Sequence, residues 1–320
     1  LLAQRLSQFD QMTIAGLSLD SRGYLTVGGR VWGVFAAHPN APVKLTVQQG
    51  LITEVRILTG AGQVLKTILL PRIYDRTGRL VDVFYEALLS SRLRQFGQAT
   101  IKGLTLDING SLTVGGRKWA RFSAHPNAPV ELTVEQGRIT GVRILDGAGR
   151  VIKTASFARI YDRTGRLVDV FSERLSSKYF SQLDQVTIRG LTLGSRGTLT
   201  VGSRLWAQFT THLNAPVEVD VEQGLVTKAR ILDPIGQVIA SYPFARIYDR
   251  TGRLLEVFYG ALPSRRLRRF DQATIKNFTL DSNGGLMVGG RTWARLPAHP
   301  NALVELDIEQ GKVTTVRILD

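Results

Sequence analysis

The chain alternates short apolar and polar positions between turn-forming residues. Val130–Glu135 (VELTVE) alternates apolar and polar side chains strictly, which is the period of a half-buried strand. Gln136-Gly137 then supplies a turn, and Arg138–Leu145 follows as the returning strand. This pattern indicates an antiparallel pair.

Three further turn signals predict more strands. Leu104–Leu106 and Leu112–Val114 flank Asp-Ile-Asn-Gly, which predicts a hairpin centred on Asn-Gly. Asp-Gly-Ala-Gly at 146–149 separates another strand pair, and Ile160–Leu167 (IYDRTGRL) predicts a hairpin that turns on Asp-Arg-Thr-Gly. About seven short strands per period are typical of a small β-barrel or β-sandwich.

One segment per period could form a helix. In Val83–Gln95 (VFYEALLSSRLRQ), Phe84, Leu88, Leu89 and Leu93 could share one face. The third copy has Pro263 in this segment, so we expect a helix there that is short or starts at the proline.

The whole pattern repeats with a period of 87 residues. Similar segments begin at Phe9, Phe96, Leu183 and Phe270, each 87 residues after the last. Internal repeats decide the fold and are weighed before other signals. We therefore predict an all-β chain: a tandem array of four small β-barrel or β-sandwich modules joined by basic connectors that contain a β-hairpin and a short helix.

The repeat divides into a core and a connector. Residues 1–8 match the end of a connector. The expected divisions are repeat 1 at 9–95 (core 9–59, connector 60–95), repeat 2 at 96–182 (core 96–146, connector 147–182), repeat 3 at 183–269 (core 183–233, connector 234–269) and repeat 4 at 270–320, core only. A core of this size is marginally stable alone, so we expect the connector hairpin to complete a neighbouring core.

The connectors begin with an apolar, strand-like segment. It occupies Val64–Leu70, Val151–Phe157 and Val238–Phe244, and the fourth core ends at Asp320 without one. If this segment pairs within its own sheet, the fourth core has an open edge that would accept another strand. Two interpretations stay open: chains that join end to end through this edge, or a chain cut from a longer array.

Composition excludes several kinds of site. The chain has no cysteine, which excludes a disulfide framework, thiolate catalysis and cysteine-ligated metals. It has no run of about 18 apolar residues, so we expect no transmembrane helix. Two methionines and no cysteine suit an oxidising, extracellular or cell-surface setting.

The positive charge is concentrated in the connectors. The net charge is +15, and the three connectors carry +3, +4 and +5 of it. The densest cluster, with no acidic residue inside it, consists of Arg265, Arg266, Arg268 and Arg269. These four are candidates to contact an anionic polymer or nucleic acid through its backbone, and that function would place the protein in the cytoplasm.

The recurrent histidines and tryptophans favour structural roles. The histidines follow the tryptophan strand in a loop (His38, His125, His212 and His299), and each lacks the neighbouring nucleophile or second ligand that catalysis or metal binding needs. The tryptophans lie in V-G-G-R-x-W or its variant, and we expect them to anchor the core (Trp32, Trp119, Trp206 and Trp293). We expect no catalytic residue, metal or cofactor.

The connector motif Y-D-R-T-G-R-L is identical in its three copies. Its tyrosine and aspartate are Tyr74 and Asp75, Tyr161 and Asp162, and Tyr248 and Asp249. The seven residues resemble the turn of YD (RHS-type) repeats of large secreted bacterial proteins. The resemblance implies a strand–turn–strand in which the aspartate and an arginine pair.

Two functions remain open at this point. The first is a non-enzymatic structural or interaction protein, a subunit of a fibre, filament or surface assembly that binds copies of itself end to end. The second is a nucleic-acid or anionic-polymer binder that uses the connector arginines. Exact periodicity without a catalytic motif favours the first.

Overall fold

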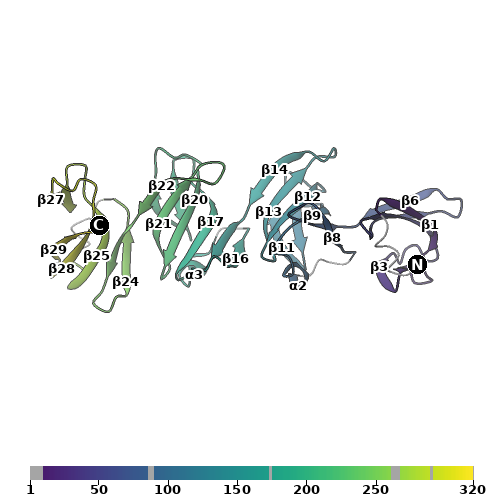
Figure 1. Cartoon of the computed structure of the whole chain (residues 1–320), viewed down its shortest axis with the longest axis horizontal. Helices are drawn as coiled ribbons and strands as arrows, with labels where there is room; N and C mark the ends of the chain where they lie inside the picture. The colour runs from purple at the N-terminus through teal and green to yellow at the C-terminus, as the bar shows by residue number, and fades with distance from the viewer. Residues whose placement is uncertain (1–9, 86–89, 173–174, 261–266, 289–290, 320) are drawn as a thin grey trace. The chain divides into compact units, whose positions relative to one another are not determined.

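A computed structural model describes residues 10–319, except 86–89, 173–174, 261–266 and 289–290. These residues form strands and short turns, with two helices of four residues each (Figure 1). The chain divides into two compact units, 1–157 and 158–320. The all-β class predicted from the sequence is confirmed.

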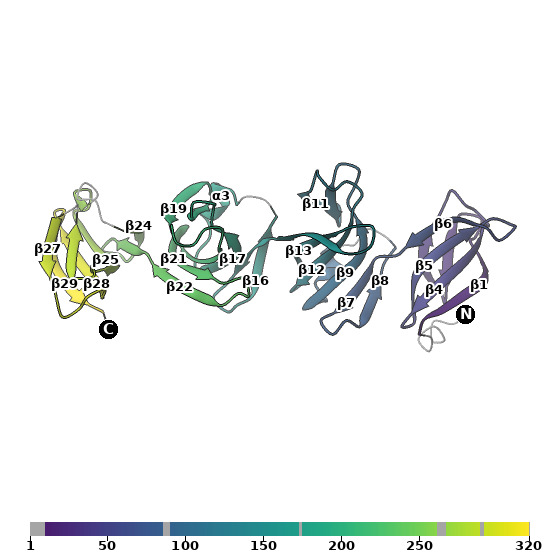
Figure 2. The same ribbon diagram turned by 90° about the horizontal axis from the view of Figure 1, so that it is seen from above.

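The first unit contains two larger sheets and two two-stranded sheets. The strand orders are β1-β4-β5-β6, β14-β13-β12-β9-β7-β8, β2-β3 and β10-β11. Figure 2 shows β13, β12, β9, β7 and β8 side by side in one sheet. The elements are β1 (Met12–Ser18), β2 (Tyr24–Val27), β3 (Arg30–Val34), β4 (Pro42–Gln48), β5 (Leu51–Leu58), β6 (Val64–Leu69), β7 (Arg72–Asp75), β8 (Leu80–Val83), α2 (Ser90–Leu93), β9 (Gln98–Thr105), β10 (Ser111–Val114), β11 (Arg117–Arg121), β12 (Pro129–Glu135), β13 (Arg138–Leu145) and β14 (Val151–Ser156).

The second unit also has two larger and two two-stranded sheets, with one strand more than the first among the described residues. The strand orders are β16-β15-β17-β20-β21-β22, β24-β23-β25-β28-β29, β18-β19 and β26-β27. The elements are β15 (Ala158–Tyr161), β16 (Leu167–Phe171), α3 (Ser177–Phe180), β17 (Val186–Thr192), β18 (Thr198–Val201), β19 (Arg204–Gln208), β20 (Pro216–Glu222), β21 (Leu225–Leu232), β22 (Val238–Pro243), β23 (Ala245–Tyr248), β24 (Leu254–Phe258), β25 (Gln272–Thr279), β26 (Gly285–Val288), β27 (Arg291–Arg295), β28 (Leu303–Glu309) and β29 (Lys312–Ile318).

The alternating segments form strands where expected. β12 pairs antiparallel with β13, with Glu135 opposite Arg138, and Gln136 and Gly137 turn the chain at positive φ. β13 pairs with β14 across Asp-Gly-Ala-Gly, and β15 pairs with β16 across Asp-Arg-Thr-Gly. Strict alternation fixes which side chains face the core, so these pairings follow from the sequence.

The hairpin predicted around Asn109-Gly110 is wrong. The strand before it, β9, pairs with β12 and β7, and the strand after it, β10, pairs with β11. Asp107 closes the turn by accepting hydrogen bonds from the backbone N–H groups of Asn109 (2.8 Å) and Ser111 (2.7 Å). The turn therefore sends the chain from one sheet to the other.

The connector helix is shorter than predicted. Val83 ends β8, Arg94 and Gln95 lie in a turn, and α2 covers Ser90–Leu93 among the described residues, which do not include 86–89. In the second connector, Ser176 caps α3 by accepting a hydrogen bond from the Tyr179 backbone N–H. The helix start expected at Pro263 lies outside the described residues.

Each two-stranded sheet packs over one face of a larger sheet. In repeat 3, Leu199 and Val201 of β18 share a buried cluster with Val217 and Val219 of β20 and Ile231 of β21. Repeat 1 buries the equivalent residues of β2, β4 and β5. Burying each such side chain contributes about 1.5–3 kcal/mol, so these clusters hold the two layers together.

Candidate functional site

The connector hairpin is built into the sheet that follows it. β7 pairs antiparallel with β9, with Ile73 opposite Ile101 and Tyr74 opposite Thr100. In the second unit, β23 pairs with β25 in the same register, with Ile247 opposite Ile275. The hairpin backbone therefore extends the next repeat's sheet by two strands.

The same hairpin also places side chains in the preceding core. Leu80 and Val83 of β8 are buried in the cluster formed by β2 to β5. The Leu80 backbone N–H donates to Oε1 of Gln49 at 2.8 Å, which fixes the hairpin against the β4–β5 turn. Arg30 of β3 donates to the Val83 carbonyl at 3.1 Å. One hairpin thus belongs to two repeats at once.

The joint between repeats 3 and 4 has the same construction. Leu254 and Val257 of β24 are buried with β20 and β21, while Ile247 of β23 lies in the core of repeat 4. Glu222 accepts hydrogen bonds from Arg246 and Tyr248, each at 3.3 Å. Partial burial raises the pKa of Tyr248, whose hydroxyl is protonated at neutral pH in any case.

Two edges of the described sheets lack the strands that the other repeats have there. β9 pairs on both sides, whereas β1, its equivalent, pairs within the described residues only with β4. β21 pairs on both sides, whereas β29 pairs only with β28 among the described residues. In β29, Val313, Val316 and Ile318 are half-buried, although their equivalents in β21 are fully buried.

The tryptophans differ in burial along the array. Trp32 and Trp119 are buried, as expected for core anchors, and Trp206 is half-buried. Trp119 stacks on Phe157, which follows β14, with the ring centres 6.3 Å apart. Trp293 departs from the expectation because it is 45% exposed, and this sequence has no residue equivalent to Phe157 in repeat 4.

The histidines lie in turns closed by the backbone. The N–H of His38, His125, His212 and His299 each donates to the carbonyl three residues earlier. The imidazole Nε2 of His212 also lies 3.2 Å from the Tyr242 hydroxyl. Within the described part of the chain, no three His, Asp or Glu side chains gather as metal ligands.

The motif turn has the predicted form, but its aspartate bonds differently from the expected pairing. Asp75 accepts hydrogen bonds from Thr77 Oγ1 (2.6 Å) and from the backbone N–H of Thr77 and Arg79. The Thr77 hydroxyl bond and these N–H bonds hold the pKa of Asp75 below its usual range. Asp162 and Asp249 repeat the arrangement. The turn's own donors satisfy the carboxylate, and the positive charge of Arg79 adds an attraction to it. The Arg76 and Arg79 side chains stay exposed and form no salt bridge within the described residues.

The arginine cluster lies only partly within the described residues. Arg265 and Arg266 fall outside them, and Arg268 and Arg269 are exposed. The backbone at Arg268 passes close to Gly311, where a Cβ would come within 2.8 Å of it. The described half of the cluster therefore lies beside the β28–β29 turn with its side chains accessible.

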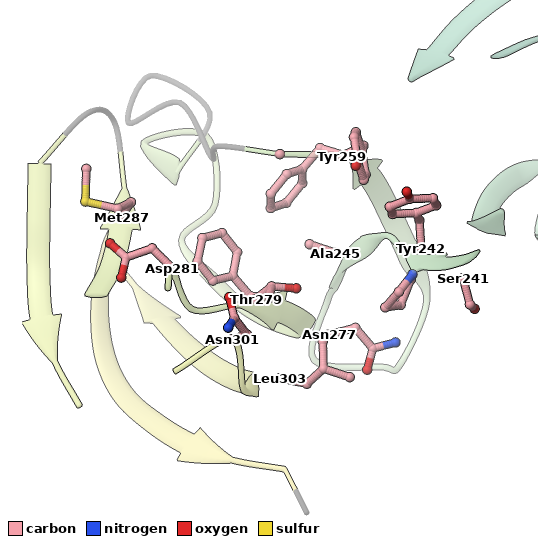
Figure 3. A pocket seen from close by; sticks show the side chains of 14 residues that line it. Ser241, Tyr242, Ala245, Tyr259, Asn277, Thr279, Asp281, Met287, Asn301 and Leu303 are labelled. Atoms are coloured by element: carbon pink, nitrogen blue, oxygen red, sulfur yellow. The ribbon is translucent and has the colours of Figure 1, made fainter. Parts of the chain in front are cut away.

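Sequence analysis missed an aromatic cluster and a cavity in the second unit. Phe209, Tyr242, Phe244 and Tyr259 form the cluster, with ring centres 4.6–5.9 Å apart. A cavity of about 570 Å³ lies beside it and reaches β25, β26 and β28 (Figure 3). The signal available in the sequence was the set of positions at which repeat 4 differs from the other three.

Comparison of the chain with known protein families, with curated proteins and with solved structures gave no match. Among the described residues, no helix has the length and apolar character needed to cross a bilayer.

Proposed function

We propose that the chain is a non-enzymatic structural or interaction protein, made of four β-sandwich modules and belonging to a fibre, filament or surface assembly outside the cell. The shared hairpin carries this proposal. The first and third connector hairpins each supply backbone to one sheet and side chains to the core before it. Repeats joined in this way cannot swing freely about a linker, which suits a load-transmitting array.

The proposal extends to contacts between copies. The outer edges of β1 and β29 are unpaired within the described residues, and the side chains of β29 are less buried than those of β21. An unpaired edge offers its N–H and C=O groups to another strand. Pairing β29 of one copy with β1 of the next would join chains end to end by β-strand complementation.

A strand added to the chain tests this association. A copy of residues 147–157 (GAGRVIKTASF) follows Asp320 in the altered chain, as it follows Asp146 in repeat 2. We expect the 320-residue chain to associate in sedimentation and to form filaments in electron micrographs. The extended chain should stay monomeric because its own strand covers β29.

In the control extension, the added copies of Ile152 and Ser156 are replaced by prolines, which prevents the added segment from pairing as a strand. This control should associate like the original chain. The proposal fails if the 320-residue chain stays monomeric at high concentration, or if both extensions behave alike.

A second function is favoured by the exposed arginines of the hairpin turns. Arg76, Arg79, Arg250 and Arg253 are exposed, and their neighbouring aspartates are engaged by the turn backbone. Such side chains suit the backbone of an anionic polymer or nucleic acid. Fluorescence anisotropy with labelled duplex DNA at increasing salt would test it.

Affinity should fall steeply with salt, and changing Arg265, Arg266, Arg268 and Arg269 to Gln should reduce both the affinity and the salt slope. Binding that is absent or insensitive to salt would exclude this function.

A further inference from the structure

The cavity of the second unit has the size and shape of a small-molecule site. Its volume of about 570 Å³ lies within the range of about 300–1,000 Å³ that is usual for such sites. Fourteen described residues line it, from the end of β22 to the start of β28. Figure 3 shows Tyr242 and Tyr259 at one end and Asp281 and Met287 at the other.

The differences between the repeats converge on this cavity. At only six core positions do repeats 1 to 3 agree while repeat 4 departs: Asn277, Phe278, Met287, Leu296, Leu303 and Ile308. Four of them, Asn277, Phe278, Met287 and Leu303, line the cavity. Unconstrained drift would scatter such changes over the core, so their clustering points to a role specific to this joint.

The changes also alter the chemistry of the wall. Asn277 replaces a glycine and keeps its left-handed backbone, with φ at 55°, so an amide side chain now stands where the other repeats have none. Tyr242 stands where the equivalent connector residues are Ile68 and Ala155. The fourth repeat thus adds a hydrogen-bonding group and an aromatic ring at one place.

The lining defines the kind of ligand. Tyr259 is 39% exposed, and its ring is available to the apolar face of a bound molecule. The side chains of Asn277, Thr279 and Asn301 make no hydrogen bond within the described residues. Amide groups both donate and accept, which matches hydroxyl groups that do the same.

The charge of the described lining disfavours anionic ligands. The fourteen described lining residues include no Lys, Arg or His, so they offer no charged partner for a phosphate, sulfate or carboxylate. The lining carboxylate, Asp281, already accepts hydrogen bonds from Asn283 and Gly285. Both bonds end on Oδ1, as they do at the equivalent Asp20 and Asp107, so this carboxylate has a structural role in its own turn.

We propose that this cavity binds an uncharged saccharide, with a sugar ring against Tyr259 and Tyr242 and its hydroxyl groups on Asn277, Thr279 and Asn301. Aromatic rings beside adaptable amide and hydroxyl groups provide an apolar contact face together with directional hydrogen bonds. The site lies in one joint of the array, so each chain would hold one sugar.

Calorimetric titration of the 320-residue chain tests the proposal. The probes are cellobiose, maltose, lactose and N,N′-diacetylchitobiose, with glucuronic acid and glucosamine as charged controls. We expect saturable binding of at least one neutral disaccharide and none of the charged sugars. Tyr259→Ser, which introduces the residue found at the equivalent position in repeat 2, should weaken binding about tenfold, or about 1.4 kcal/mol.

Two further variants separate binding from folding. Asn277→Gly restores the residue of the other repeats and suits the left-handed backbone, so it should weaken binding while the unfolding transition stays unchanged. Tyr85→Ser makes the Tyr259→Ser change at the equivalent position in the first unit and should leave binding intact. The proposal is overturned if none of the four disaccharides binds, or if binding survives both Tyr259→Ser and Asn277→Gly.

Discussion

Strands β21 and β29 occupy equivalent positions in repeats 3 and 4, yet they differ in burial. Val226, Ala229 and Ile231 of β21 are fully buried, whereas Val313, Val316 and Ile318 of β29 are half-buried. The connector makes the difference: β22, Phe244 and the hairpin residues Leu254 and Val257 all cover β21. A core sequence alone therefore does not close its own hydrophobic core in this protein.

Removing the largest covering side chain should have the greatest effect. Phe244→Ala leaves a cavity at a fully buried position, and we expect unfolding by denaturant to show a loss of about 3–5 kcal/mol. Ile239→Ala on β22 is the matched control, because that side chain is 56% exposed and should cost less than about 0.5 kcal/mol. Similar costs for the two would show that Phe244 does not close the core.

The two faces of β24 test the sharing of the hairpin. Leu254 is 4% exposed in the preceding core, and the next residue, Leu255, is 40% exposed. We expect Leu254→Ala to cost about 2–5 kcal/mol and to destabilise repeat 3, although β24 belongs to the sheet of repeat 4. Leu255→Ala should change stability little. Hydrogen exchange of repeat 3 amides would locate the effect.

Two equivalent ion pairs, one in repeat 3 and one in repeat 4, show how packing of the connector on the core changes the strength of an ion pair. Arg230 forms two 2.7 Å bonds with Asp220, and Arg317 forms bonds of 2.7 and 2.8 Å with Asp307, but the Arg230 side chain is 20% exposed and that of Arg317 is 48% exposed. We expect Asp220→Asn to cost about 1–2 kcal/mol and Asp307→Asn less than about 1 kcal/mol. Equal losses of stability for the two variants would show that packing of the connector does not strengthen the ion pair.

The same pair predicts a pH dependence. Partial burial acts to raise the pKa of Asp220, but hydrogen bonds from Arg230 and Thr187 outweigh it, so the pKa lies below its ordinary range. The stabilisation is therefore complete above about pH 4, near the value for an unfolded chain, and is lost as the pH falls through the lower folded value. Denaturation of the wild type and Asp220→Asn should converge toward low pH.

Fluorescence gives the smallest and most local test. Trp293 is 45% exposed, while Trp32 and Trp119 are 4% and 7% exposed. Trp293→Phe should remove most of the emission that acrylamide quenches, and Trp119→Phe should not. If both variants keep the same quenchable fraction, repeat 4 is as well covered as the others.

Strand positions and several pairings followed from the sequence because alternation and turn residues act locally. The Asp-Arg-Thr-Gly turn is an example, since its aspartate bonds only to the next four residues. The error at Asn109-Gly110 arose because a turn signal marks a change of direction and does not choose the partner strand. Gly115-Gly116, at positive φ, closes the actual hairpin between β10 and β11, and a glycine pair is itself a hairpin signal.

The sites depended on contacts across repeats. The exposure of Trp293 depends on which segment packs on which core. So does the placement of Leu254, whose strand lies in the sheet of repeat 4 while its side chain is buried in repeat 3. The sequence of a single repeat does not determine these contacts. The cavity was detectable in part, because Asn277 and Leu303 break a pattern that three repeats obey. Its tyrosines, in a connector, could be placed beside them only in three dimensions.

The shared hairpin also sets a delay during synthesis. Core 183–233 leaves the ribosome before the residues that close it, and the last of these is Val257, 24 residues later. At about 5–20 residues per second, the nascent core waits roughly 1–5 s with β21 uncovered. Neighbouring cores of nearly identical sequence emerge in succession, so each must avoid capturing the wrong hairpin during that wait.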